Sequence, residues 1–162
     1  MSLVLRTARN GRGAGIIEFA FVLPILLLLV LSIFDFGLYF FAQHTLQFAT
    51  REGARLALVG RVLNDEDGNP LSREASIVKT VRDCAALAIN PGRLQISVYP
   101  VEPDYSDPAD WQNTQNAGLP GAYMRVTTRY DYPFLTPLLA SMVPGGHIVV
   151  QAQATYRNEA FD

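Results

Sequence analysis

An uninterrupted apolar segment near the amino end constrains this 162-residue chain more than any other feature. No charged residue occurs between Glu18 and Asp35, which are 17 positions apart. A run of this length is typical of a membrane-spanning helix. At 1.5 Å per helical residue the two carboxylates are about 26 Å apart, against roughly 30 Å for a hydrocarbon core. We therefore expect both near the edges of the bilayer, and Asp35 to be a charge at the interface.

The span is predicted to cover residues 14–41 and to be retained in the protein. A secretory signal peptide has an apolar core of about 7 to 15 residues that ends at a small-x-small cleavage site. The run in this chain is longer and has no such site. Its far end is rich in aromatic residues, which predict an aromatic belt at the second interface. These residues are Phe34, Phe36, Tyr39, Phe40 and Phe41.

Charge is distributed unevenly on the two sides of the span. Residues 1–13 contain Arg6, Arg9 and Arg12 and no acidic residue, whereas residues 42–162 carry ten basic and thirteen acidic residues. A basic amino end before a first span favours a cytoplasmic amino terminus, so the remainder is expected on the outer side. No basic patch with interleaved aromatic residues is present, and nucleic acid is therefore not an expected partner.

The basic segment ends at Gly13, and the residues that follow form a recognisable pattern. Gly13, four further residues and then Glu18-Phe19 at the start of an apolar helix resemble the processing site of type IV pilins and pseudopilins. The resemblance implies that a prepilin peptidase cuts after Gly13, so that Ala14 becomes the first residue and Glu18 the fifth. Cleavage after Gly11 or Gly15 would instead make Glu18 the seventh or the third residue.

Three further stretches narrow the resemblance. Glu18-Phe19-Ala20-Phe21-Val22-Leu23-Pro24, Phe34-Asp35-Phe36-Gly37 and Ala49-Thr50-Arg51-Glu52-Gly53-Ala54-Arg55 together resemble the TadE-like family, minor pseudopilins of the tight-adherence pilus. The commonest family pattern has Glu at the position of Asp35. The resemblance implies partners among other pilins and pseudopilins, an inner-membrane assembly platform and membrane lipid. Bulk pilins of this system are much shorter, which disfavours a major subunit. Residues expected in packing and assembly are Glu18, Pro24, Asp35, Gly37, Arg51, Glu52, Gly53 and Arg55.

Residues 42–60 are predicted to continue the same helix beyond the membrane. A stripe of small and apolar residues recurs at three- and four-residue spacing, and Gly53 within it is expected to permit close packing. Arg51 and Glu52 are either part of a packing surface or simply solvated. Pro24, inside the span, is either a passive kink or, by resemblance to type IV pilins, a point where the helix loosens in a filament.

Residues 61–162 are expected to form a globular domain. For the whole chain we predict an α+β, pilin-like fold. Residues 61–71 form an acidic turn that lacks the ligand pattern of a calcium loop. Ser72 is the expected N-cap of a second helix that ends near Ile89. Alternating residues predict strands at 94–99, 123–132 and 147–157 in a small antiparallel sheet, the first of them half-buried. The apolar segment 134–143 is too short to span a membrane and either packs under the sheet or forms an exposed patch.

The loop 101–120 is long, rich in proline and acidic. It is interpreted as a solvated loop, as a partner contact through Tyr105 and Trp111, or as a cation site, for which the spacing fits no ligand pattern. Cys84 is interpreted as a packed thiol or an intersubunit disulfide. No catalytic motif, metal-ligand cluster or cofactor-binding loop occurs, and an enzyme is not expected. The alternative function is an uncleaved, membrane-anchored binding domain that engages an envelope partner through the loop 101–120.

Overall fold

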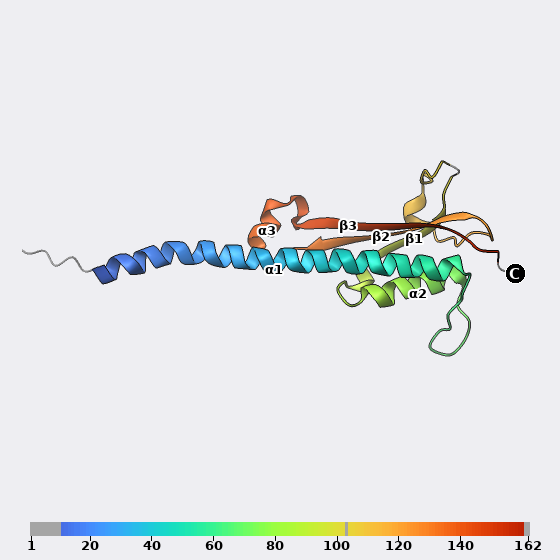
Figure 1. The fold of residues 1–162 in the computed structure, drawn as a ribbon, viewed down its shortest axis with the longest axis horizontal. Helices are drawn as coiled ribbons and strands as arrows, with labels where there is room; N and C mark the ends of the chain where they lie inside the picture. The colour runs from blue at the N-terminus through green and yellow to red at the C-terminus, as the bar shows by residue number, and fades with distance from the viewer. Residues whose placement is uncertain (1–10, 103, 161–162) are drawn as a thin grey trace, which may run out of the picture.

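The computed structural model describes residues 11–102 and 104–160. The predicted leader, residues 1–13, lies largely outside the described residues. Helix α1, Gly11–Leu58, is a single 48-residue helix that continues through Pro24. At 1.5 Å per residue it is about 72 Å long, and the other elements gather along its carboxyl-terminal half (Figure 1).

Helix α2, Arg73–Ala85, begins where the sequence predicts. The Ser72 hydroxyl accepts a hydrogen bond from the Ala75 amide at 3.1 Å, as an N-cap should. The helix ends at Ala85 rather than near Ile89, because the backbone tightens into a turn in which Ala88 and Ile89 both donate to the Ala85 carbonyl. A short 3-10 helix, η1 (Pro91–Arg93), then leads into the sheet.

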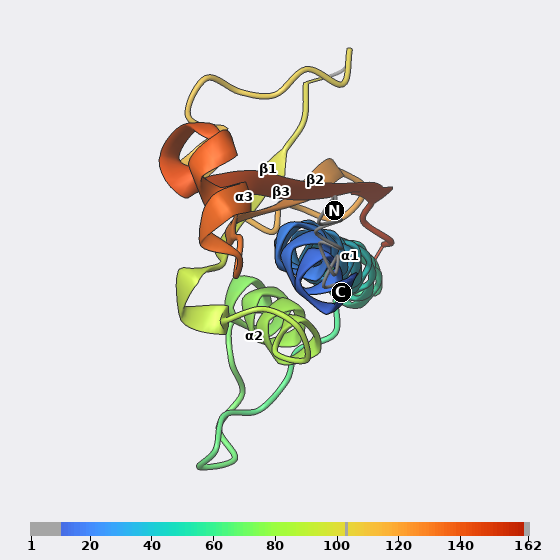
Figure 2. The same ribbon diagram turned by 90° about the vertical axis from the view of Figure 1, so that its left-hand side faces the viewer.

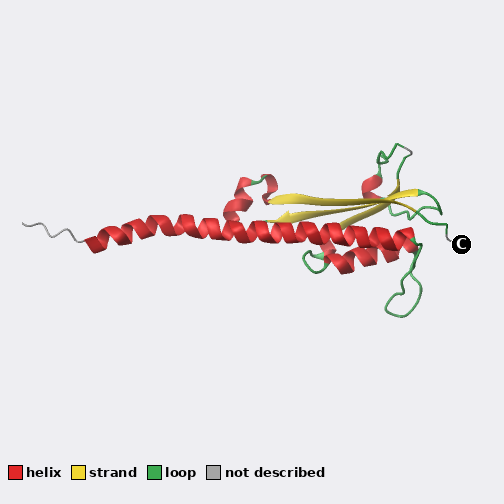
Figure 3. Ribbon diagram, viewed as in Figure 1, coloured by secondary structure: helices red, strands yellow, loops and turns green. Residues whose placement is uncertain are grey.

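The sheet consists of β1, Gln95–Pro100, β2, Tyr123–Pro133, and β3, His147–Arg157, in the order β1-β2-β3. Both pairs are antiparallel, with Val98 opposite Val126 and Val126 opposite Ala154. The predicted α+β class is therefore confirmed (Figure 3). Between β2 and β3 lie a short helix, α3 (Pro137–Met142), and the 3-10 turn η3 (Pro144–Gly146).

Helix α1 lies between the sheet and α2, as both ribbon views show (Figures 1 and 2). The core is therefore built around the carboxyl-terminal half of α1. Most of the residues that α1 contributes to this core are alanines, and their small side chains allow α2 and the sheet to approach the helix closely. The principal buried apolar side chains are Ala42, Leu46, Ala49, Ala57, Ile77, Val81, Val98, Met124, Val126 and Val150.

Strand β1 is more buried than its sequence suggests. The prediction of a half-buried strand is wrong, because Ser97 and Tyr99 on its outer face are also buried. The loop that follows folds back over this face and pairs with the free edge of the strand. Val98 donates its amide to the Thr114 carbonyl at 3.0 Å, and its carbonyl accepts from the Asn116 amide at 2.7 Å. The 3-10 helix η2, Trp111–Asn113, belongs to this covering segment.

Candidate functional site

The amino-terminal half of α1 stands apart from the rest of the structure. Its apolar side chains between Ile16 and Phe34 are exposed or half-exposed. Among the described residues, α1 is the one helix that is long and apolar enough to cross a membrane, as judged by length and composition. Ser32 bonds its hydroxyl to the Leu28 carbonyl at 2.7 Å, so that it exposes no free donor to a surrounding apolar phase. This half of α1 is suited to lipid or to other apolar helices.

The predicted processing site lies at the start of α1. Gly13 is exposed, and a methyl group added to it would meet no heavy atom within 4 Å. Glu18 is also exposed, and within the part of the chain that the structure describes it forms no ion pair. Gly13 and Glu18 precede Asp35 by 22 and 17 residues, about 33 and 26 Å along the helix. The site is therefore far from the folded domain.

The prediction of an interfacial charge at Asp35 is corrected in one respect, because the carboxylate is enclosed by the protein and not solvated. The Asp35 side chain is 2% exposed. One carboxylate oxygen accepts the Leu135 amide at 3.0 Å, and the other accepts the Thr136 amide at 2.8 Å. Thr136 is the N-cap residue of α3 and uses no side-chain cap of its own. The carboxylate from α1 thus satisfies the backbone donors at the turn into α3 and joins the two elements, which are 100 residues apart in sequence.

An aromatic cluster surrounds this Asp35 junction. Phe36 packs edge-on against Phe134, and Tyr39 packs edge-on against Tyr132, with ring centroids 6.3 and 5.7 Å apart. Tyr132 and Phe134 also contact each other. Burial and then the nearby Asp35 charge raise the pKa of Tyr132. Two members of the expected aromatic belt, Phe36 and Tyr39, therefore contact the folded domain. Phe36 nevertheless stays 45% exposed, and Phe34, Phe40 and Phe41 are also exposed.

The carboxyl-terminal half of α1 packs against α2 on one side and against the sheet on the other, within the same chain. A Cβ on Gly53 would lie 2.4 Å from a Val81 methyl group, so the prediction that this glycine permits close packing is confirmed. The packing is with α2 of the same chain. On the other side, the hydroxyls of Thr50 and Thr128 lie 2.7 Å apart in the core.

The charged residues of this half are at the surface. Arg51 is exposed, and Arg55 bonds to Glu52 at 2.7 Å across one turn of the helix. Such exposed pairs contribute little to stability, about 0–1 kcal/mol. Gly37 is exposed and meets no heavy atom within 4 Å of an added methyl group. It faces away from the folded domain.

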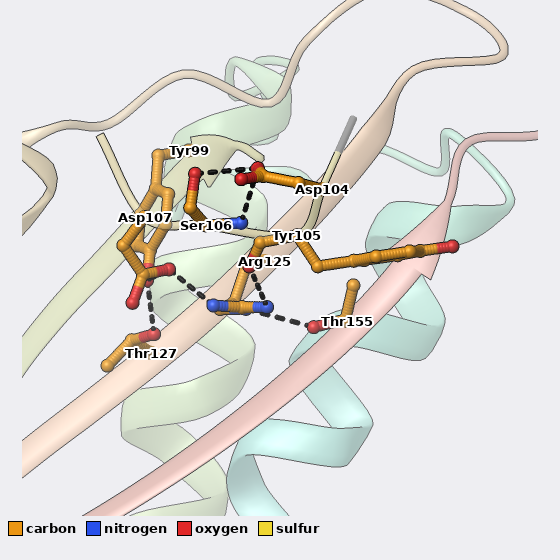
Figure 4. A network of polar contacts seen from close by, with 8 residues as sticks. All are labelled: Tyr99, Asp104, Tyr105, Ser106, Asp107, Arg125, Thr127 and Thr155. Atoms are coloured by element: carbon orange, nitrogen blue, oxygen red, sulfur yellow. Dashed lines mark hydrogen bonds and ion pairs between the residues drawn. The ribbon is translucent and has the colours of Figure 1, made fainter. Parts of the chain in front are cut away.

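The loop 101–120 lies at the opposite end of the domain from α3 and is held by a polar network (Figure 4). Arg125 of β2 donates to the Asp107 carboxylate and to the Tyr105 carbonyl. Asp107 also accepts the hydroxyl of buried Tyr99 at 2.9 Å, and that hydroxyl lies 3.0 Å from the Thr127 hydroxyl. Burial is the main reason that the pKa of Tyr99 is raised.

The two aromatic residues singled out in this loop differ in accessibility. Trp111 is half-buried and packs against Tyr99, with centroids 5.6 Å apart. Tyr105 is 53% exposed and lies against Tyr123. Tyr105 also has a φ of 64°, an uncommon conformation for a residue with a side chain.

The remaining reactive groups are dispersed. Cys84 is half-buried against the core as a free thiol. Burial, followed by the charges of Glu52 and Asp83, raises the pKa of Cys84. Among the described residues, no group of three or more His, Cys, Asp or Glu side chains is placed to hold a metal ion.

Two contacts described above were not predicted from the sequence: the hydrogen bonds of Asp35 to the turn before α3, and the contact between Thr50 and Thr128. The partner of Asp35 is a backbone turn, although Thr136 followed by Pro137 is a recognisable helix start. The Thr50–Thr128 contact carries no local signal, because both residues occupy ordinary positions in their elements.

Comparison with known proteins agrees with the resemblance inferred from the first helix. Residues 13–55 match the family model described as TadE-like protein. The match begins at Gly13 and ends three residues before the end of α1, so it covers the exposed half, the Asp35 junction and most of the packed half. No curated protein and no solved structure matches the chain significantly.

Proposed function

Because residues 13–55 are TadE-like, we propose that this chain is a minor pseudopilin, a non-catalytic subunit that takes part in assembling a tight-adherence type pilus. In this proposal α1 anchors it once in the bacterial inner membrane, with its amino end in the cytoplasm and the folded domain in the periplasm. The observation that carries the proposal is the spacing of Gly13 and Glu18 at the start of a long exposed apolar helix.

The proposed maturation step is cleavage after Gly13 by prepilin peptidase. Gly13 is exposed and precedes the Asp35 junction by about 33 Å of helix. A membrane-embedded peptidase can therefore reach this segment without contacting the folded domain. Cleavage would convert the amide nitrogen of Ala14 into a free amine four residues before Glu18. Positions i and i+4 share one face of a helix, so this amine and the carboxylate are neighbours.

The proposed role of Glu18 is to pair with that amine, either its own or that of an adjacent subunit. An unpaired carboxylate in a low-dielectric phase is unfavourable, whereas a pair between helices also defines their register. Glu18 is available for such a pair, because it forms no ion pair among the described residues. The exposed apolar face around it would supply the packing surface for other pilins, pseudopilins and the assembly platform.

Mass spectrometry of the protein from cells with and without the peptidase tests the cleavage. Gly13→Val should leave the original amino terminus intact even when the peptidase is present. Gly15→Val is the matched control, since a side chain at either glycine meets no neighbour, and its product should begin at Ala14. An intact Met1 in the unmodified protein under both conditions would overturn the proposal.

A separate variant distinguishes processing from assembly. Glu18→Gln keeps the size of the side chain and removes its charge. We expect it to be cleaved but to enter pili poorly, as measured by co-purification with sheared filaments. Glu159→Gln, at the other end of the chain, controls for a general effect of losing one acidic residue. Normal incorporation of Glu18→Gln would refute the pairing role while leaving the cleavage intact.

A second candidate function, partner binding by the loop 101–120, is favoured by the conformation of Tyr105. Positive φ at a residue with a side chain costs about 1–3 kcal/mol and is found where surrounding structure enforces it. Here Arg125 holds the Tyr105 carbonyl at 3.0 Å, and the ring stays 53% exposed. Tyr105→Ala tests the contact without removing Trp111, which covers Tyr99. Loss of pilus assembly or adhesion with normal processing would support it, and unchanged assembly and adhesion would refute it.

A further inference from the structure

The segment 133–143 forms an exposed apolar surface next to the exposed amino-terminal half of α1. Its most exposed side chains are Leu135 and Met142, at 70% and 73%, and Leu138 is 45% exposed. Leu138 and Met142 are four residues apart and share one face of α3. No charged residue occurs between Asp131 and His147. An apolar surface of this kind on a folded domain marks an interaction site.

The fold directs this segment toward the amino-terminal end of α1. Helix α3 is the part of the folded domain nearest that end (Figure 1). In the view along α1 from its amino-terminal side, α3 lies in front of the sheet and beside α1 (Figure 2). The Asp35 hydrogen bonds to Leu135 and Thr136 fix this position.

The level of the segment along α1 coincides with the expected end of the hydrocarbon core. Residues 15–34 comprise twenty residues, or about 30 Å of helix, which is roughly the thickness of that core. Asp35 and its backbone partners therefore lie at the outer boundary when this stretch spans the bilayer. The apolar surface is also continuous, because Leu38 and Phe41 of α1 line one groove together with Pro133 and Leu135.

Several polar groups of the segment are already satisfied within the chain. Lipid requires backbone donors to be satisfied internally. Asp35 satisfies the amides of Leu135 and Thr136, and the Ala140 amide donates to the Thr136 carbonyl at 3.0 Å. The Ser141 hydroxyl donates to the Leu138 carbonyl at 2.7 Å. The Asp35 charge is itself enclosed.

From these observations we propose that residues 133–143 insert into the interfacial region of the outer leaflet as a second membrane contact beside α1. The occupant of the exposed surface is bilayer lipid, because the surface continues the apolar face of α1 at the level where the bilayer ends. The inference rests on the membrane anchoring of α1 in the proposed function. Together the two contacts hold the folded domain at a fixed height and tilt on the membrane, which a single helix leaves free.

Depth-dependent fluorescence quenching tests this contact in the full-length protein. Leu138→Cys and Met142→Cys, each in a Cys84→Ser background, are labelled with an environment-sensitive dye and reconstituted into phosphatidylethanolamine and phosphatidylglycerol vesicles. Val22→Cys, in the span, and Leu119→Cys, in the loop 101–120 and 77% exposed, are matched controls. Lipids that carry a nitroxide at the headgroup or deep in the acyl chain serve as quenchers.

We expect headgroup nitroxide to quench labels at 138 and 142 at least twofold more than the label at 119, with blue-shifted emission. Labels at 138 and 142 that behave like the label at 119 would overturn the inference. Shielding that depends on protein concentration, with crosslinking between copies at position 138 or 142, would also overturn it in favour of a protein interface. Quenching at 22 by the deep nitroxide reports the anchor independently, so failure of the anchor is distinguishable from failure of this contact.

Discussion

Replacing Asp35 by Asn should loosen the junction between α1 and α3 without unfolding the domain. The carboxylate accepts two amides, one on each oxygen, and an Asn side chain offers only one acceptor. Its NH2 group would then face an amide donor. The loss of one hydrogen bond to a charged group is worth about 1.5–3 kcal/mol, and a buried donor left unsatisfied costs about 1–3 kcal/mol. We expect local opening to become easier by about 3 kcal/mol, or roughly 150-fold.

Hydrogen exchange of the Leu135 and Thr136 amides measures this opening, because Asp35 is their hydrogen-bond acceptor. Both amides should exchange much faster in Asp35→Asn, while amides in β2 such as that of Val126 should keep their protection. Asp83→Asn is the matched control, since that carboxylate pairs with Lys79 at the surface of α2. Exchange at 135 and 136 that stays within about twofold of the unmodified protein would refute the assigned role of Asp35.

Three further experiments test the packing and electrostatics of the domain. Gly53→Val should lower the free energy of unfolding by about 1–3 kcal/mol through overpacking against Val81, and Val81→Ala should restore part of the loss in thermal denaturation. Cys84, whose pKa is raised chiefly by burial, should react with iodoacetamide at pH 8 more slowly in the native than in the unfolded protein; equal rates would contradict its packing. Although burial opposes the shift, backbone hydrogen bonds, including one from Ala117, lower the pKa of Glu74. The stability it contributes is therefore present above its unfolded pKa and lost as pH falls through the folded pKa, and Glu74→Gln should flatten the pH dependence of stability below about pH 5.

The long helix was predictable because its signals are local and repeated. An uncharged stretch between Glu18 and Asp35 and a stripe of small residues beyond it each specify helix over many turns. Gly53 was recognisable for the same reason, since a glycine inside a strong helical pattern needs a packing explanation. The alternation of apolar and polar residues likewise identified strands β2 and β3.

The environment of β1 and of Asp35 was not predictable, because each depends on a loop that is distant or irregular. Alternation in β1 marks one buried face, but Tyr99 on the other face is buried by Trp111 and its neighbours. No periodic signal in the loop 101–120 indicates that it folds back. For Asp35, a charge at the end of an apolar run suggests the interface, and only the tertiary fold reveals that it accepts amides 100 residues away. A charge expected to snorkel is instead satisfied inside the protein.

The two carboxylates of α1 therefore have opposite roles. Asp35 is satisfied by its own chain and binds the folded domain to the helix. Glu18 finds no ion pair among the described residues, although both carboxylates lie at the ends of one apolar stretch where an uncompensated charge is unfavourable. Mutating Asp35 should thus affect the protein in isolation, whereas mutating Glu18 should affect it only when a cation is supplied by cleavage or by a neighbouring subunit. Equal local loosening of isolated Asp35→Asn and Glu18→Gln proteins would contradict this division of the helix.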